Sequence, residues 1–465
     1  MEASQREGDV LPENGSFGYL YEVLITSALN STISTKAQLE KKYTFLSLLA
    51  FHMFQSSSNI LSVSATEHLL DAYSEDYKVK VDKKALLADL EYARVLEKQD
   101  GNYAFLYPHF YQYFLARYFK NQINSPQGVE LRKRLEDIAT GVNIHANRTF
   151  LMFFIYMTHD EPLTDFIIAL GQKVLDDVTE SNLTDEVDFY NSKDFVGVGT
   201  QPIPESVDLE VSRRDRRERE DRVQKPVTDL DAGWNIHVPD NPYSSTMSVS
   251  DKLSYADSCV EVLGQILRNF TGSLPGDRKL LILDATYRLG LRNLHAILRL
   301  LSEATIFVRE SLAKVNPKTD AEKRFVKSIQ RFLLVVGQLV GTSTFHNLSL
   351  SIGSPDIEET AYEEVLERVG RTNATELINL AIKLDHFEGY PVEDIRRLHR
   401  QFAANRFADD ALKGLVISHM HVFHISRETR QKVLAIWGRT PDDGMLVRAT
   451  KRFKESITEQ DSEKH

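Results

Sequence analysis

With 465 residues, of which 42% are hydrophobic and 26% charged, the chain has the composition of a soluble globular protein and is too long for a single core. Its net charge of −11 argues against general affinity for nucleic acid, which requires clustered excess Lys and Arg. The single cysteine, Cys259, excludes an internal disulfide framework and a cysteine-based zinc finger, and is typical of a reducing cytoplasm.

Neither an export signal nor a membrane span is predicted. Residues 1–16 are polar and lack an apolar core. The longest apolar runs, 149–157 and 332–336, are much shorter than the ~20 residues that a spanning helix requires. We therefore expect a cytoplasmic protein without a membrane partner.

The first predicted domain follows a lead-in, residues 1–34, that carries one short helix. Helical spacing predicts further helices over 36–54, 64–73 and 82–94. Ser64 and Glu67 have the spacing of a capping box, in which each side chain binds a free backbone amide at the helix start.

A tight β-hairpin is predicted next. Two short strands, 95–99 and 102–106, flank Asp100-Gly101, which suits a two-residue turn because glycine accepts a positive φ without steric cost. Pro108 then stands in the first turn of an aromatic helix, where proline is tolerated. Three helices followed by a hairpin are the element order of a winged-helix domain, which we place at residues 35–122.

The rest of the chain is predicted to be helical on both sides of a linker. We expect a helical extension at 123–179, a largely irregular linker at 180–251, a helical domain at 252–450 and a disordered tail at 451–465. Within the last domain, helices are predicted at 252–269, 277–313, 319–341, 358–384, 392–404, 408–425 and 427–437. The predicted fold class is mainly α, with one small β-hairpin.

No credible active site is visible in the sequence, so we expect no enzyme activity and no cofactor. The phosphate-binding motif G-x-x-x-x-G-K-[ST] is absent, and Asp284 therefore reads as a carboxylate on a helix surface rather than a magnesium ligand. His419, His421 and His424 diverge around a helix, so we interpret them as packing or surface histidines and predict no metal site. Cys259 lies on an apolar helix and reads as a small core residue.

DNA binding is disfavoured by the charges of the predicted winged helix. Its presumptive recognition helix, 82–94, carries Lys83 and Lys84 but also three carboxylates, and the hairpin offers only Lys98 against two more. Contacts to phosphates dominate affinity for DNA, and this surface supplies few of them. We instead assign Lys83, Lys84, Lys98 and Arg117 to an interaction surface for another protein.

The hairpin and the helix behind it carry a resemblance to a known family. FLYPHFYQYFLARYF (105–119) resembles the end of the winged-helix domain of bacterial STAND signalling ATPases, relatives of the NACHT group. The segments 143–170 and 261–294 resemble later helical blocks of the same large proteins. The positions of the family pattern are filled by Phe105, Tyr107, Tyr113, Phe114, Ala116 and Arg117.

The resemblance places Tyr107 at the position where NACHT-type members use a histidine that senses the bound nucleotide. Tyrosine can donate one hydrogen bond to a phosphate but cannot carry the imidazolium charge. The family's P-loop domain, which precedes the winged helix, is not seen, and only residues 17–29 resemble its helical lid. The resemblance therefore implies a truncated or split gene product, or a stand-alone module.

The sequence-based hypothesis is a non-catalytic regulatory and sensor module of a STAND-type signalling or antiviral-defence protein of bacteria. It would act through protein–protein contacts, with a P-loop ATPase chain in trans as the expected partner. The main alternative is a winged-helix transcriptional regulator that binds DNA and has a helical ligand domain. A degenerate fragment without a retained role and an enzyme are further alternatives.

Overall fold

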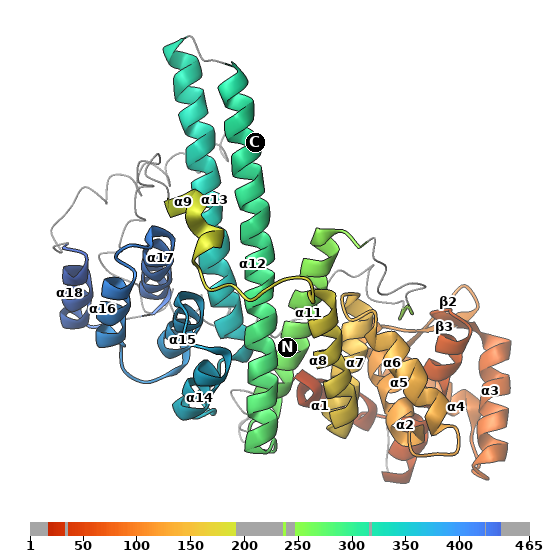
Figure 1. Cartoon of the computed structure of the whole chain (residues 1–465). Coiled ribbons are helices and arrows are strands. Elements are labelled where there is room, and N and C mark those ends of the chain that lie inside the picture. The colour runs from red at the N-terminus through yellow and green to blue at the C-terminus, as the bar shows by residue number, and fades with distance from the viewer. Residues whose placement is uncertain are drawn as a thin grey trace, which may run out of the picture. The chain divides into compact units, whose positions relative to one another are not determined.

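The structure is a computed structural model that describes residues 17–32, 36–191, 236–238, 247–315, 319–423 and 425–438. Over these residues the chain is mainly helical with a small three-stranded antiparallel sheet, which confirms the predicted fold class (Figure 1). None of the described helices is long and apolar enough to cross a membrane. The chain forms two compact units, unit 1 from residues 1–174 and 224–270 and unit 2 from residues 175–223 and 271–465.

Unit 1 contains the three-stranded sheet and the helices that surround it. Its elements are α1 (Phe17–Asn30), α2 (Lys36–Gln55), β1 (Ile60–Ser62), α3 (Val63–Asp76), α4 (Lys83–Tyr92), β2 (Leu96–Gln99), β3 (Asn102–Phe105), α5 (Pro108–Gln122), α6 (Gly128–Ala139), α7 (His145–Thr158), α8 (Glu161–Val174) and α11 (Val249–Asn269). α5 packs between α2 and α7, so the aromatic helix lies at the centre of the unit.

The predicted hairpin is confirmed, and a third strand joins it. β3 pairs with β2 across a two-residue turn in which Asp100 and Gly101 both have positive φ, 50° and 76°. The additional strand is β1, whose Leu61 pairs with Tyr103 of β3, giving the order β1-β3-β2. Three residues are too few to show a clear alternating pattern, and β1 was therefore not predicted.

The predicted capping box at Ser64 is wrong. α3 begins at Val63, and its N-cap is Ser62, two residues before Ser64; the Ser62 hydroxyl accepts a hydrogen bond from the amide of Ala65 at 3.2 Å. Ser62 is also the last residue of β1, paired with Asn102, so the sheet holds it in the extended conformation that an N-cap needs.

Unit 2 is all-helical and is built around two long helices. Its elements are a 3-10 turn (Asp185–Val187), α9 (Asp188–Asn191), α12 (Gly276–Val315), α13 (Asp320–Ile352), α14 (Glu359–Val369), α15 (Asn373–His386), α16 (Val392–Gln401), α17 (Arg406–Val422) and α18 (Arg427–Ile436). α12 and α13 lie side by side as a helical hairpin, and α14, α15 and α17 pack against it (Figure 1).

One predicted helix of unit 2, 358–384, is two helices in the structure. The break falls at Gly370, whose φ of +105° is poorly accessible to residues with a side chain. Thr372 then caps α15, because its hydroxyl accepts from the amide of Thr375 at 3.2 Å while the Thr375 hydroxyl accepts from the amide of Thr372.

The predicted linker is structured at both ends. Near its start, Tyr190 is fully buried in unit 2, and its hydroxyl donates to Asp410 of α17 at 3.0 Å. Near its end, the amide of His237 donates to the Asn147 side chain of unit 1 at 2.9 Å. Residues 192–235, which include the charged run 213–222, and the tail from residue 451 lie outside the described residues.

The compact units also differ from the expected boundary at residue 252. α11 was expected to open the C-terminal domain, but it packs against α7 and α8 in unit 1. Tyr255 donates to the carbonyl of Thr140 at 2.9 Å, and Arg148 binds Ser258 at 3.0 Å and Glu261 at 3.1 Å. These polar contacts fix α11 on the N-terminal helices.

Candidate functional site

The candidate site is the junction between β3 and α5, where Tyr107 lies. The chain is extended at Tyr107 (φ −131°, ψ 142°) because the next residue, Pro108, disfavours helical geometry before it. Tyr107 occupies the N-cap position of α5 without capping it, so its side chain is left for other contacts. The side chain is 43% exposed, which is high for a large aromatic residue beside the core.

A short aromatic stack, Tyr107–His109–Tyr21, supports this exposed ring. The rings of Tyr107 and His109 are nearly parallel, with centroids 6.0 Å apart, and Tyr21 of α1 meets His109 edge-on at 4.9 Å. Tyr21 in turn contacts Phe153 of α7 at 5.4 Å. Tyr107 is therefore held on a platform that rests on the core, although α1 belongs to a different part of the sequence.

Sequence reasoning missed His109. The histidine of the motif was sought at position 107, but this chain carries an imidazole two residues later, packed against Tyr107. Burial, together with the nearby charge of His145, lowers the pKa of His109 to about 4. His109 is therefore neutral at pH 7, and it cannot supply the positive charge that Tyr107 lacks.

We expect the low pKa of His109 to make unit 1 less stable in acid. An unfolded histidine has a pKa near ~6.5, so the unfolded state binds a proton before the folded state does. The free energy of unfolding should then fall as the pH decreases from about 6.5 towards 4, and His109→Phe should flatten this dependence. Urea unfolding of unit 1, monitored by hydrogen exchange, gives the free energy of unfolding. Repeating it at several pH values measures how this free energy changes with pH.

His68→Phe is the matched control, since His68 is exposed on α3 and lies outside the aromatic stack; an equal change in slope in both variants would refute the assignment to His109. The His109 ring can also be titrated directly by NMR. An apparent pKa near ~6.5 for His109 would contradict the assignment of a neutral, half-buried ring.

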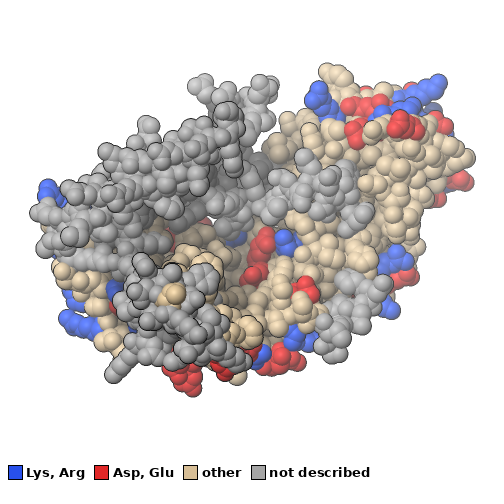
Figure 2. Space-filling view, turned by 90° about the horizontal axis from the view of Figure 1, so that it is seen from above, with Lys and Arg blue, Asp and Glu red and all other residues tan. Residues whose placement is uncertain are grey.

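The three lysines assigned to the interaction surface have different surroundings. Lys83 forms an ion pair with Asp71 of α3, while Lys84 is exposed on α4. Lys98, at the end of the hairpin, lies 5.7 Å from the ring centroid of Tyr103. Acidic and basic side chains are intermixed on the face shown in Figure 2, without an extended basic area among the described residues.

Arg117 contributes mainly to packing inside unit 1. Its guanidinium lies 4.4 Å from the ring centroid of Tyr43, and it pairs with Glu40 at 3.7 Å, both on α2. The side chain is only 20% exposed. The contacts of Lys83, Lys98 and Arg117 are thus made with other residues than Tyr107, and the role of the four basic residues in binding a partner stays a prediction.

The other residues considered for chemistry lie in ordinary structural settings. Asp284 is on α12 and pairs with Arg288 one turn later at 2.9 Å. Cys259 is fully buried, and burial raises the pKa of its thiol well above the usual value. His419 is buried between Phe423 and Tyr390. Over the part of the chain that the structure describes, no three His, Cys, Asp or Glu side chains form a group that could bind a metal.

Comparison with known proteins gives a match to a family model. The family model described as Novel STAND NTPase 4 matches residues 59–115, which run from β1 to the middle of α5 and include Tyr107. The match supports a relationship to STAND-type NTPases over this segment. No match was found among curated proteins or among solved structures.

Proposed function

We propose that this chain is a non-catalytic regulatory and sensor module of a STAND-type signalling protein, acting through protein–protein contacts. The observation that carries the proposal is the family match over residues 59–115, which ends within the helix that follows Tyr107. The proposal takes the setting to be bacterial signalling or antiviral defence in the cytoplasm. It takes the partner to be a P-loop ATPase chain acting in trans.

We further propose that residues 35–122 are a winged-helix domain. Three features support this: the order of α2, α3 and α4 before the hairpin, the antiparallel sheet β1-β3-β2, and the aromatic helix α5 behind the sheet. In this reading the hairpin is the wing and α4 is the recognition helix. The domain would bind a protein surface rather than DNA, because Lys83 already forms an ion pair with Asp71 and few basic side chains are left for phosphates.

In the proposed mechanism Tyr107 contacts the partner at its nucleotide. The exposed hydroxyl can donate one hydrogen bond to a phosphate oxygen, and the supporting ring of His109 restricts the rotamers of Tyr107. The contact would be sensitive to the γ-phosphate but weaker than that of an imidazolium, since Tyr107 brings no charge. A trigger bound by unit 2 would then bias a two-state switch in the partner.

A photo-crosslinking amino acid at position 107 tests this proposal. With benzoylphenylalanine replacing Tyr107 in the native host, we expect crosslinks to a protein whose sequence contains a P-loop. The matched control places the same amino acid at Val129 of α6, which lies outside residues 35–122 and is 86% exposed. Because position 129 is more exposed, random collisions would label it at least as well as position 107.

Four results would contradict the proposal. One is crosslinking that is equal at the two positions, and another is a partner set without P-loop proteins. The third is DNA binding by the purified chain with a steep dependence on salt, which would favour the transcriptional regulator instead. Nucleotide hydrolysis by the purified chain that Asp284→Asn abolishes would refute the non-catalytic role.

A further inference from the structure

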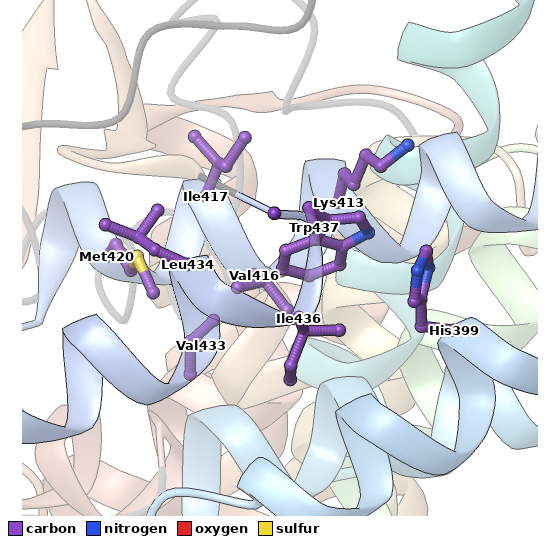
Figure 3. A pocket seen from close by; sticks show the side chains of 10 residues that line it. His399, Lys413, Val416, Ile417, Met420, Val433, Leu434, Ile436 and Trp437 are labelled. Carbon is purple, nitrogen blue, oxygen red and sulfur yellow. The ribbon is translucent and has the colours of Figure 1, made fainter. Parts of the chain in front are cut away.

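Unit 2 contains a cavity between α16, α17 and α18 that the proposed function does not use (Figure 3). Its volume is about 500 Å³, within the range of ~300–1,000 Å³ that is usual for small-molecule sites. Ten residues line it: His399, Lys413, Val416, Ile417, Met420, Val433, Leu434, Ile436, Trp437 and Gly438. Most of the lining is therefore apolar, with polar groups from only a few residues.

The apolar part of the cavity is formed by neighbouring turns of two helices. Val416 and Met420 of α17 stand one turn apart on the same face, and Val433 of α18 lies across from them in Figure 3. All three side chains are almost fully buried. Trp437 is only half-buried and presents its indole ring to the cavity, which gives a bound molecule a flat aromatic surface.

The polar part of the cavity is organised by one carboxylate, that of Asp409 on α17. Asp409 binds Nδ1 of His399 at 2.7 Å, Nζ of Lys413 at 2.6 Å and the indole N–H of Trp437 at 3.4 Å. These contacts come from α16, from α17 itself and from Trp437, the residue that follows α18. The carboxylate thus holds the three polar lining groups together at one end, while the other end stays apolar.

The carboxylates at the polar end of the cavity are matched by an equal number of cations. Asp410, the next residue of α17, lies 3.5 Å from Nζ of Lys413 and 3.7 Å from the guanidinium of Arg406. Two carboxylates, Asp409 and Asp410, are therefore faced by the two cations Lys413 and Arg406. A charged ligand would have to compete with these pairs and lose its own hydration, which is costly inside an apolar cavity.

We propose that this cavity binds an uncharged, mainly apolar small molecule with one hydrogen-bonding group at one end. The apolar body fills the space between α17 and α18 and lies against Trp437, and the polar end meets Lys413 and His399. Lys413 has three N–H donors, of which two face Asp409 and Asp410, so one remains for an acceptor on the ligand. The inference stands on this geometry whether or not the chain belongs to a signalling system.

Two fluorescent probes that differ by a single sulfonate test both parts of the proposal. Phenylnaphthylamine is neutral, and anilinonaphthalene sulfonate is its anionic counterpart. The chain has two tryptophans, Trp234 and Trp437, so Trp234→Phe leaves the cavity tryptophan as the only one. In that variant we expect saturable binding of the neutral probe, with a dissociation constant on the order of 10 µM, and energy transfer from Trp437.

Adjacent positions of α18 supply a matched pair of variants. Ile436 lines the cavity and Ala435 is exposed to solvent, so each can receive the same new carboxylate. Ile436→Glu should weaken binding of the neutral probe more than about tenfold, because it buries a charge beside the ligand. Ala435→Glu should leave binding within about twofold, and thermal melts of both variants check that unit 2 remains folded.

The outcomes separate the proposal from its alternatives. Tighter binding of the neutral probe, sensitive to Ile436→Glu alone, supports it. Equal or tighter binding of the sulfonate refutes the uncharged ligand, and equal effects of the two glutamates refute the site. Binding that appears only after residues 439–465 are deleted would show that this segment of the chain fills the cavity, and would overturn the proposal. None of these results bears on the crosslinking test at position 107.

Discussion

Replacing Phe114 by alanine is expected to lower the free energy of unfolding of unit 1 by about 3–5 kcal/mol. Phe114 is completely buried in α5, where its ring contacts those of Tyr113 at 5.2 Å, Tyr43 at 5.6 Å and Phe105 at 5.9 Å. The neighbouring rings belong to α2, β3 and α5 itself. Their backbones are fixed by other contacts, so they cannot close around the space that the truncation leaves.

Hydrogen exchange in α2 and α5 measures this loss, because the protection of central amides reports the opening free energy of the unit. Phe110→Ala is the control on the same helix, since Phe110 is only half-buried and lies near the exposed Tyr107. Phe110→Ala should lower the free energy of unfolding clearly less than Phe114→Ala does. A Phe114→Ala variant as protected as the wild type would show that α5 is not the centre of the core.

The parts of unit 1 that the sequence predicted correctly depend on local chemistry. Asp100-Gly101 permits few conformations other than a two-residue turn, and Pro108 fixes the start of the next helix. The aromatic residues of α5 recur at helical spacing, and residues 111–116 are all buried because the helix packs between α2 and α7. In each case a few neighbouring residues determine the structure, so their pattern is visible without knowledge of the fold.

The incorrect predictions concern positions where contacts with residues distant in the sequence select among several local structures. Ser62 and Ser64 are both good N-caps by sequence, and it is the pairing of Ser62 with Asn102 that selects the first. The amphipathic pattern of α11 shows that one face is buried but not against which helices, and its assignment to unit 1 depends on partners such as Thr140. Tyr190 likewise lies in a polar stretch, and its burial depends on Phe407 and Asp410 of α17, which are far away in the sequence.

At the candidate site, too, only the part formed by residues that are neighbours in the sequence could be predicted. Tyr107 could be identified because its motif is continuous in sequence. The stack beneath it could not, since Tyr21 lies 86 residues before Tyr107 and reaches His109 only through the packing of α1. The low pKa of His109 depends on that packing, and no local pattern contains it.

Replacing Asp89 by alanine is expected to cost unit 1 about 2–3 kcal/mol, although Asp89 itself is 41% exposed. Its partner Lys42 on α2 is only 3% exposed, and its ammonium donates to Asp89 at 2.8 Å. Without Asp89 this buried charge keeps only the hydroxyl of Thr32 at 2.7 Å and its carbonyl at 3.1 Å. Breaking a fully buried pair costs ~3–5 kcal/mol, and the access of water to Asp89 reduces the figure here.

A double-mutant cycle distinguishes the interaction between Lys42 and Asp89 from the cost of burying the charge of Lys42. Lys42→Met keeps the volume of the side chain and removes the charge, so we expect a change within about 1 kcal/mol. In the Lys42→Met background, Asp89→Ala should then cost almost nothing, and the difference between the two backgrounds measures the coupling of the two charges. An equal cost in both backgrounds would mean that Asp89 acts through its place on α4 rather than through Lys42.

The expected result also bears on function, because a carboxylate that neutralises Lys42 contributes less negative charge to the surface of α4. The sum of the charged side chains of α4, which is close to zero, would then understate the positive charge that this helix presents. The salt dependence of any DNA binding should therefore be measured on the Lys42→Met variant as well as on the wild type.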